Sequence, residues 1–125
     1  MNTKKPDNRT RSFCEAIIAK RLGDISTLPN KLVKHVFYVY GNFIVAYLNI
    51  LRQKEGKPRD WFPESLSIDP ALGDEMRHFF SDYQHLTKAF LTLNKQMDDL
   101  RKIDKDKQPN LYEHTVAGIL SHEER

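Results

Sequence analysis

The stretch from Lys31 to Lys54 constrains the fold of this chain more than any other. Read at about 100° per residue, its polar side chains fall on one narrow stripe, formed by Lys31, Lys34, His35, Tyr38, Asn42, Asn49 and Arg52. The residues around the rest of the helix are almost all apolar. Because such a helix has to be buried by several neighbours, we expect a central helix over about residues 29–55 of a helical bundle.

The apolar part of this stretch is too short to cross a membrane. Only Val36 to Leu51 is free of charged residues, whereas a spanning helix needs roughly 20 apolar residues. With 125 residues, 39% hydrophobic and 30% charged, the chain has the composition of one globular domain. Cys14 is the single cysteine, so no internal disulfide forms. The first residues lack the apolar core of a signal peptide, and we expect a cytoplasmic protein.

The N-terminal part carries a helix start and a helix stop. Ser12 to Glu15 has the S-x-x-E pattern of a capping box, which satisfies two free amide groups at a helix start. Apolar residues then share one face up to Gly23, a residue type that ends helices. We therefore predict a short helix after a disordered basic arm over residues 1–9, and one folded domain over residues 10–125.

The longest periodic signal follows Asp69-Pro70, a pair that suits a helix start. Apolar residues then alternate spacings of four and three without interruption, at Leu72, Met76, Phe79, Tyr83, Leu86, Phe90, Leu93, Met97 and Leu100. This pattern predicts one long helix over about residues 70–103, packed antiparallel on the central helix. A homodimer through the same apolar seam is the open alternative.

A second capping-box pattern, Asn110 to Glu113, predicts a last short helix. No alternation typical of strands competes with these helical periods. The sequence therefore predicts an all-α protein, a four-helix bundle with two long central helices at about 29–55 and 70–103. Two shorter helices would cover them.

Known catalytic motifs are missing: there is no Gly-rich phosphate loop, G-x-S-x-G, CxxC or H-E-x-x-H. A set of possible metal ligands has helical spacing, formed by Glu75, His78, Asp82 and His85. Metal sites in bundles draw ligands from facing helices, and the central helix offers only His35. We expect neither an enzyme nor a bound metal or cofactor.

Charge is distributed unevenly along the chain. Residues 1–60 hold twelve Lys and Arg against five Asp and Glu, a net charge of +7, whereas residues 61–125 carry a net charge of −4. Such asymmetry is typical of an electrostatic binding face or of two halves that attract each other within one bundle. A nucleic acid would contact the basic residues Lys4, Lys5, Arg9, Arg11, Lys20 and Arg21.

A set of short motifs lies between residues 30 and 83: Asn30-Lys31-Leu32-Val33, Val45-Ala46-Tyr47 with Asn49, Gly56-Lys57, Ala71-Leu72-x-Asp74 and Asp82-Tyr83. Together they resemble the Rsd/AlgQ family of anti-sigma regulators, which are small cytoplasmic helical bundles of bacteria. The resemblance implies binding to the promoter-recognising C-terminal region of the housekeeping sigma factor, which is thereby withheld from RNA polymerase core and −35 DNA. It carries over Asp74 and Asp82 as acidic contacts.

We therefore predict a non-catalytic protein-interaction module, monomeric or homodimeric, whose most specific partner is a sigma factor. Partner contacts are expected from Asp74, Glu75 and Asp82 and from the loop residues Trp61 and Phe62. The two aromatic residues either anchor a partner or cover the open end of the bundle. The alternative function is a nucleic-acid-binding accessory protein that uses the basic N-terminal half.

Overall fold

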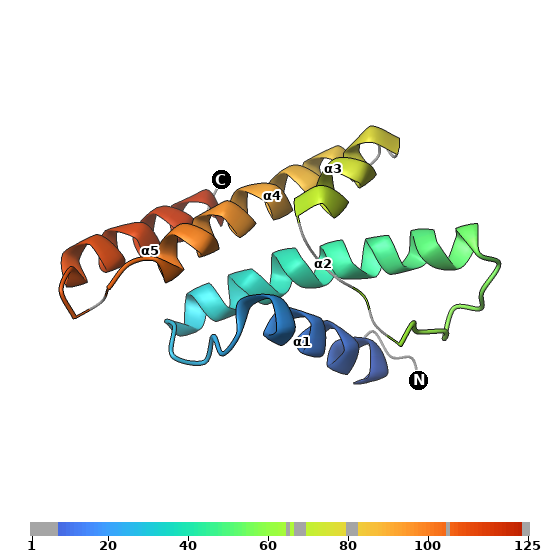
Figure 1. The fold of residues 1–125 in the computed structure, drawn as a ribbon, viewed down its shortest axis with the longest axis horizontal. Helices are drawn as coiled ribbons and strands as arrows, with labels where there is room; N and C mark the ends of the chain where they lie inside the picture. The colour runs from blue at the N-terminus through green and yellow to red at the C-terminus, as the bar shows by residue number, and fades with distance from the viewer. Residues whose placement is uncertain (1–7, 65, 67–69, 80–82, 105, 124–125) are drawn as a thin grey trace.

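The computed structural model describes residues 8–64, 66, 70–79, 83–104 and 106–123. These residues form five α-helices: α1 Asn8–Leu22, α2 Asn30–Lys54, α3 Pro70–Phe79, α4 Gln84–Arg101 and α5 Pro109–Glu123 (Figure 1). No strand occurs in these ranges, which confirms the all-α class. The molecule is arranged in layers, with α1 on one side of α2 and the other three helices on the opposite side (Figure 1).

Helix α2 is the central helix that the sequence predicted. Its apolar face is buried against neighbours on both sides, with Leu32, Val36, Val39, Tyr40, Phe43, Ile44, Leu48 and Ile50 in the core. Five of the seven predicted stripe residues are exposed: Lys31, Lys34, Tyr38, Asn42 and Asn49. The other two differ, since His35 is buried and Arg52 is half-buried. Gly56 ends the helix with a φ of 65°, as expected.

The predicted single helix over residues 70–103 is wrong, because α3 and α4 fold back on each other as a hairpin. Leu91 lies beside Gly73: an alanine Cβ at position 73 would be 2.9 Å from Leu91 Cδ2. In one continuous helix these two residues would lie about 27 Å apart. Met76 and Phe90 are both fully buried, so the two arms face one core and the apolar spacing continues across the turn. Met76 and Phe90, at the centre of the predicted seam, are thus buried within the chain.

Helix α1 begins earlier than predicted, at Asn8, so residues 8–9 are helical and Ser12 lies inside the helix. The first turn is held by a contact that no local pattern reveals. The Arg9 guanidinium lies 4.9 Å from the centre of the Phe62 ring, and its Nη2 donates to the Asp60 carbonyl oxygen at 3.3 Å. Residues 1–7 of the predicted basic arm lie outside the described residues.

The centre of the core contains an aromatic cluster between α2 and α4. Phe43 and Phe90 are stacked with ring centroids 3.9 Å apart, and Tyr40 meets Phe90 edge-on at 5.0 Å. The buried Tyr40 hydroxyl donates to Asn94 Oδ1 at 2.8 Å. Burial raises the pKa of Tyr40, so the phenol keeps the proton that this hydrogen bond needs.

Candidate binding surface

The aromatic loop residues named above are engaged within the chain. The Phe62 ring packs on Phe13 with centroids 5.1 Å apart and lies 4.9 Å from the guanidinium groups of both Arg9 and Arg52. The carbonyl oxygen of Trp61 accepts a hydrogen bond from Arg52 Nε at 2.8 Å. Cations over aromatic faces are attracted by the ring quadrupole. These contacts tie α1 to the end of α2 and favour the covering role of this loop.

The predicted acidic contacts are only partly described. Asp74 is exposed on α3 and pairs with Arg77 of the same helix at 2.8 Å. The side chain of Glu75 and the whole of Asp82 lie outside the described residues. Of the acidic trio, the described part of the structure therefore places a single carboxylate on the surface, next to its own cation.

Half of the basic residues predicted to contact nucleic acid interact with other side chains of the chain. Lys20 is exposed on α1, and Lys4 and Lys5 lie outside the described residues. The other three have partners in the chain: Arg9 at Phe62, Arg11 with Glu15 at 3.4 Å, and Arg21 with Asp98 at 3.2 Å. The Arg21 pair links α1 to α4 and is the best shielded from solvent, with the arginine side chain 21% exposed. The structure thus uses part of this basic set to hold helices together.

A different surface stands out, the exposed stripe of α2 that runs between α1 and α4. Tyr38 is 68% exposed and is one of two large hydrophobic residues exposed in the described ranges. Asn42 lies one turn further along and donates from Nδ2 to the Tyr38 carbonyl oxygen at 2.6 Å. Hollows flank this stripe on both sides. We call the stripe and its two flanking grooves the open face of α2.

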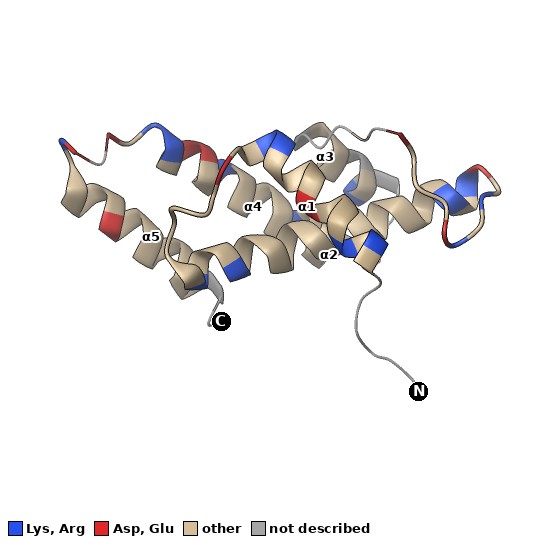
Figure 2. Ribbon diagram, turned by 90° about the horizontal axis from the view of Figure 1, so that it is seen from below, with Lys and Arg blue, Asp and Glu red and all other residues tan. Residues whose placement is uncertain are grey.

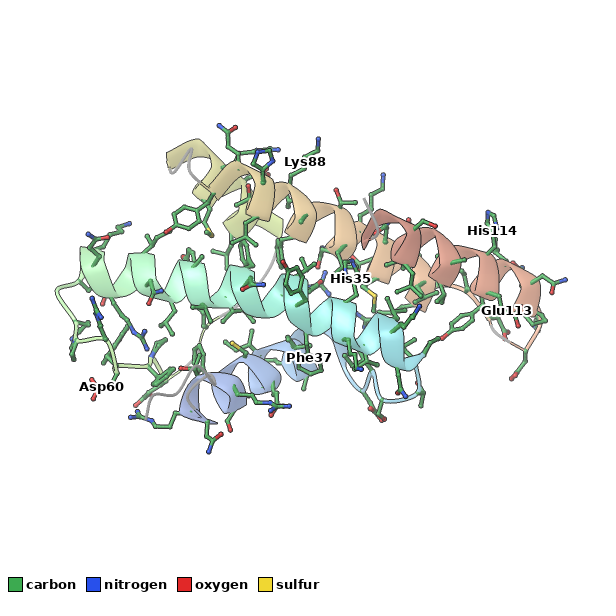
Figure 3. All side chains as sticks on the ribbon, turned by 180° about the vertical axis from the view of Figure 1, so that it is seen from behind. His35, Phe37, Asp60, Lys88, Glu113 and His114 are labelled. Carbon is green, nitrogen blue, oxygen red and sulfur yellow. The ribbon has the colours of Figure 1, made fainter. Side chains whose placement is uncertain are left out.

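The first groove lies between α1 and α2 and has a volume of about 540 Å³. Its floor includes Phe37, Gly41, Val45 and Cys14, and Figure 3 shows Phe37 pointing from α2 toward α1. Polar and charged side chains, including Thr10, Arg11, Glu15 and Lys34, complete its lining. An apolar floor within a polar rim is the usual anatomy of a protein-binding surface.

The second groove lies between α2 and α4. It consists of two neighbouring hollows of about 520 Å³ each, and Val39 and Ala89 line both of them. One end is lined by His35, which lies between the two helices (Figure 3), together with His85 and Lys88. The other end is apolar and aromatic, with Val45, Ala46, Tyr83 and Leu86.

The open face carries positive charge. Among the described residues that line its grooves, Glu15 supplies the one carboxylate, and it is paired with Arg11. Lys34 and Lys88 form no ion pair with any described residue. Figure 2 shows that the charged positions of α2 are basic and those of α1 mostly basic, whereas α4 and the loops carry both signs. The unpaired lysines leave this face suited to an acidic partner.

The described side chains offer little for catalysis. Burial raises the pKa of the Cys14 thiol to about 11, with a smaller contribution from the charge of Glu15. A thiol with so high a pKa is a poor nucleophile at neutral pH.

In the described ranges no group of three His, Cys, Asp or Glu side chains is placed to hold a metal ion. Of the ligand set noted in the sequence, the side chains of Glu75 and His78 and the whole of Asp82 lie outside the described part of the structure. Glu113 and His114 are exposed on α5 and project in different directions (Figure 3).

Of the helices described, none combines the length and the apolar character that crossing a bilayer requires.

Sequence reasoning identified the polar stripe of α2 but not the grooves beside it. A groove depends on how far the neighbouring helices stand from the stripe, which no local pattern encodes. The one signal that was present is Gly41, a glycine inside an otherwise apolar helical run.

Comparison of the chain with family models, with curated proteins and with solved structures gave no match. The resemblance over residues 30–83 therefore rests on its short motifs alone.

Proposed function

We propose that this chain is a non-catalytic helical module that binds another protein through the open face of α2. The observation that carries this proposal is the exposed stripe at Tyr38 and Asn42, flanked on both sides by grooves with apolar floors. Protein interfaces are built from such pockets, in which a buried apolar centre is surrounded by a polar rim.

The character of Tyr38 supports a binding role. Its side chain is 68% exposed, so the fold gains little from its aromatic ring. Tyrosine is enriched among the residues that dominate binding energy, because it offers a large rigid contact area with a polar tip. An exposed tyrosine between two grooves can anchor a partner that fills both.

Sequestration of a sigma factor is the most specific form of this proposal. The family resemblance includes Val45, Ala46 and Asn49, and these three residues line the groove between α2 and α4. The residues that suggest the family thus coincide in part with the surface proposed here. In this form, Asp74 and Asp82 would supply acidic contacts to the basic DNA-binding region of the partner.

Nucleic-acid binding is the second candidate, favoured by the exposed and unpaired cations Lys20, Lys31 and Lys34. Phosphate contacts release counterions, so affinity for nucleic acid falls steeply as salt rises. Burial of apolar side chains in a groove responds far less to salt. Titration of nucleic acid at two salt concentrations therefore separates the two candidates.

Affinity capture from the protein's own cells, with and without nuclease, tests the proposal. The wild type is compared with a Tyr38→Ala, Asn42→Ala double variant and with Leu111→Ala, a matched control because Leu111 is 47% exposed on α5. We expect one stoichiometric protein that survives nuclease, is lost with the double variant and is kept with the control. Equal capture by all three proteins would refute the open face as the binding surface, and a sigma factor in the captured band would identify the specific form.

A further inference from the structure

Gly41 has no explanation within the described part of the chain. It lies in the middle of α2, where glycine weakens a helix relative to alanine. Its φ is not positive, since the positive values in the described residues are at Gly23 and Gly56. A Cβ at position 41 would meet no heavy atom of the described residues within 4 Å. Neither the backbone conformation nor the packing of the described residues requires a glycine at this position.

Gly73 shows the alternative case. There a Cβ would lie 2.9 Å from Leu91 Cδ2, so the glycine lets α3 approach α4 closely. Gly41 instead lines the groove between α1 and α2, so the missing side chain leaves the helix backbone accessible from that groove. A bare stretch of helix backbone on the floor of a groove allows another helix to approach closely.

From this geometry, and resting on the proposed function, we infer that the groove between α1 and α2 seats an amphipathic α-helix of the partner. The helix crosses α2 at Gly41, places apolar side chains on Phe37, Val45 and Cys14, and carries carboxylates along its flanks. This is helix-in-groove recognition, in which residues at helical spacing fill an apolar groove.

The positive charge around the groove between α1 and α2 favours a partner helix that carries carboxylates. Lys34 lines the groove and Lys31 is exposed about one turn before it, and neither forms an ion pair with a described residue. On the opposite wall, Arg11 is 71% exposed in its pair with Glu15, which is 49% exposed. A symmetric second copy would bring the same cations against one another. A nucleic acid would use the lysines but leave the apolar floor uncovered.

Two synthetic peptides of about 18 residues test this inference. They share one apolar face of Leu and Ala, and the flanking positions are Glu in the first peptide and Lys in the second. In ¹⁵N-labelled full-length protein, we expect the Glu peptide to shift amide signals of residues 11–15 and 33–45 and to bind about tenfold more tightly than the Lys peptide. Equal binding of both peptides, no binding of either, or signal shifts confined to other helices would overturn the inference.

Matched glycine variants locate the crossing point. Gly41→Leu places a side chain in the groove, whereas Gly118→Leu makes the same change on α5, where a Cβ also meets no atom within 4 Å and the residue is exposed. We expect about a tenfold loss of Glu-peptide affinity for the first variant and no change for the second. Circular dichroism confirms that both variants fold, since each replaces a helical glycine by a better helix former.

A matched charge pair tests the electrostatic part. Lys34→Glu is expected to weaken binding of the Glu peptide severalfold and to strengthen binding of the Lys peptide. Lys95→Glu, at an exposed position on α4, should change either affinity only slightly. Equal effects of Gly41→Leu and Gly118→Leu, or of the two lysine variants, would overturn the inference. Sedimentation of the free protein as a dimer that Gly41→Leu dissociates would identify a second copy as the occupant instead.

The two proposals fail in different ways. If cells yield a protein whose capture depends on Tyr38 and Asn42 but not on Gly41, the binding module stands and the acidic helix at Gly41 falls. If capture depends on none of these residues, both proposals fall.

Discussion

Tyr38 and Tyr40 lie two residues apart on α2 and mark opposite faces of the helix. Tyr40 is fully buried, with its hydroxyl hydrogen-bonded to Asn94 of α4. Near it, Arg21 of α1 is held by Asp98 of α4. Tyr38 is 68% exposed, with a groove on each side and the unpaired Lys34 one turn away.

This difference separates residues that maintain the fold from residues available for binding. On the Tyr40 face, polar and charged groups find partners within the chain, and removing one leaves another buried group unsatisfied. On the Tyr38 face, polar groups face solvent and apolar groups line grooves. Substitutions on the first face should therefore change stability, whereas substitutions on the second should change binding.

The largest effect is expected from Phe90→Ala. Phe90 is fully buried and stacks on Phe43, so its loss should lower the free energy of unfolding by about 3–5 kcal/mol. Chemical denaturation followed by circular dichroism measures this change. A loss below about 1 kcal/mol would contradict the central position given to this ring.

The reactivity of Cys14 gives the next largest effect. The pKa is raised from 9.0 to about 11, so at pH 8 the folded protein holds on the order of 100-fold less thiolate than the unfolded chain. A disulfide reagent should label the folded protein correspondingly slowly, and the rate should climb as the pH approaches 11. Because the folded pKa is the higher one, folding also loses stability as the pH rises from about 9 to 11. Equal labelling rates in buffer and in urea would show that the thiol is not protected.

The two tyrosines offer a direct comparison. Tyr40→Phe leaves Asn94 without its buried donor and should cost about 1–3 kcal/mol of unfolding free energy. Tyr38→Phe removes an exposed hydroxyl and should change stability by less than about 0.5 kcal/mol. Both values come from the same denaturation experiment, and similar costs for the two variants would remove the distinction between the faces.

Two of the helical glycines, Gly41 and Gly73, should respond to alanine with opposite signs. Gly41→Ala meets open space and should stabilise the protein by about 0.5–1 kcal/mol. Gly73→Ala meets Leu91 and the buried Phe90 ring at 2.9–3.3 Å and should destabilise it by about 1 kcal/mol. Thermal unfolding distinguishes the signs, and stabilisation by both variants would mean that α3 does not pack closely on α4.

The features that sequence predicted correctly depend on one helix at a time. The polar stripe of α2 and the glycines that follow α1 and α2 appear where helical periodicity and backbone preference place them. The break between α3 and α4 was missed because both helices present apolar residues to the same core, so the apolar spacing continues from one helix into the next.

The candidate site was harder to predict, because it arises between helices. The contact of Arg9 with Phe62 joins residues far apart in sequence, so the sequence alone left open whether Phe62 anchors a partner or covers the end of the bundle. The grooves beside Tyr38 depend on where α1 and α4 pack. Gly41 was visible in the sequence, but its meaning depends on knowing that no side chain among the placed residues approaches it.

Site-specific photo-crosslinking in the protein's own cells tests the role of the open face most directly. A photoreactive phenylalanine analogue replaces Tyr38 in one sample and Leu111 in another, since both positions are exposed and hydrophobic. We predict that position 38 gives one dominant crosslink to another protein and that position 111 does not. Crosslinks at position 111 alone, or none at position 38, would contradict the assignment of the open face of α2 as the binding surface.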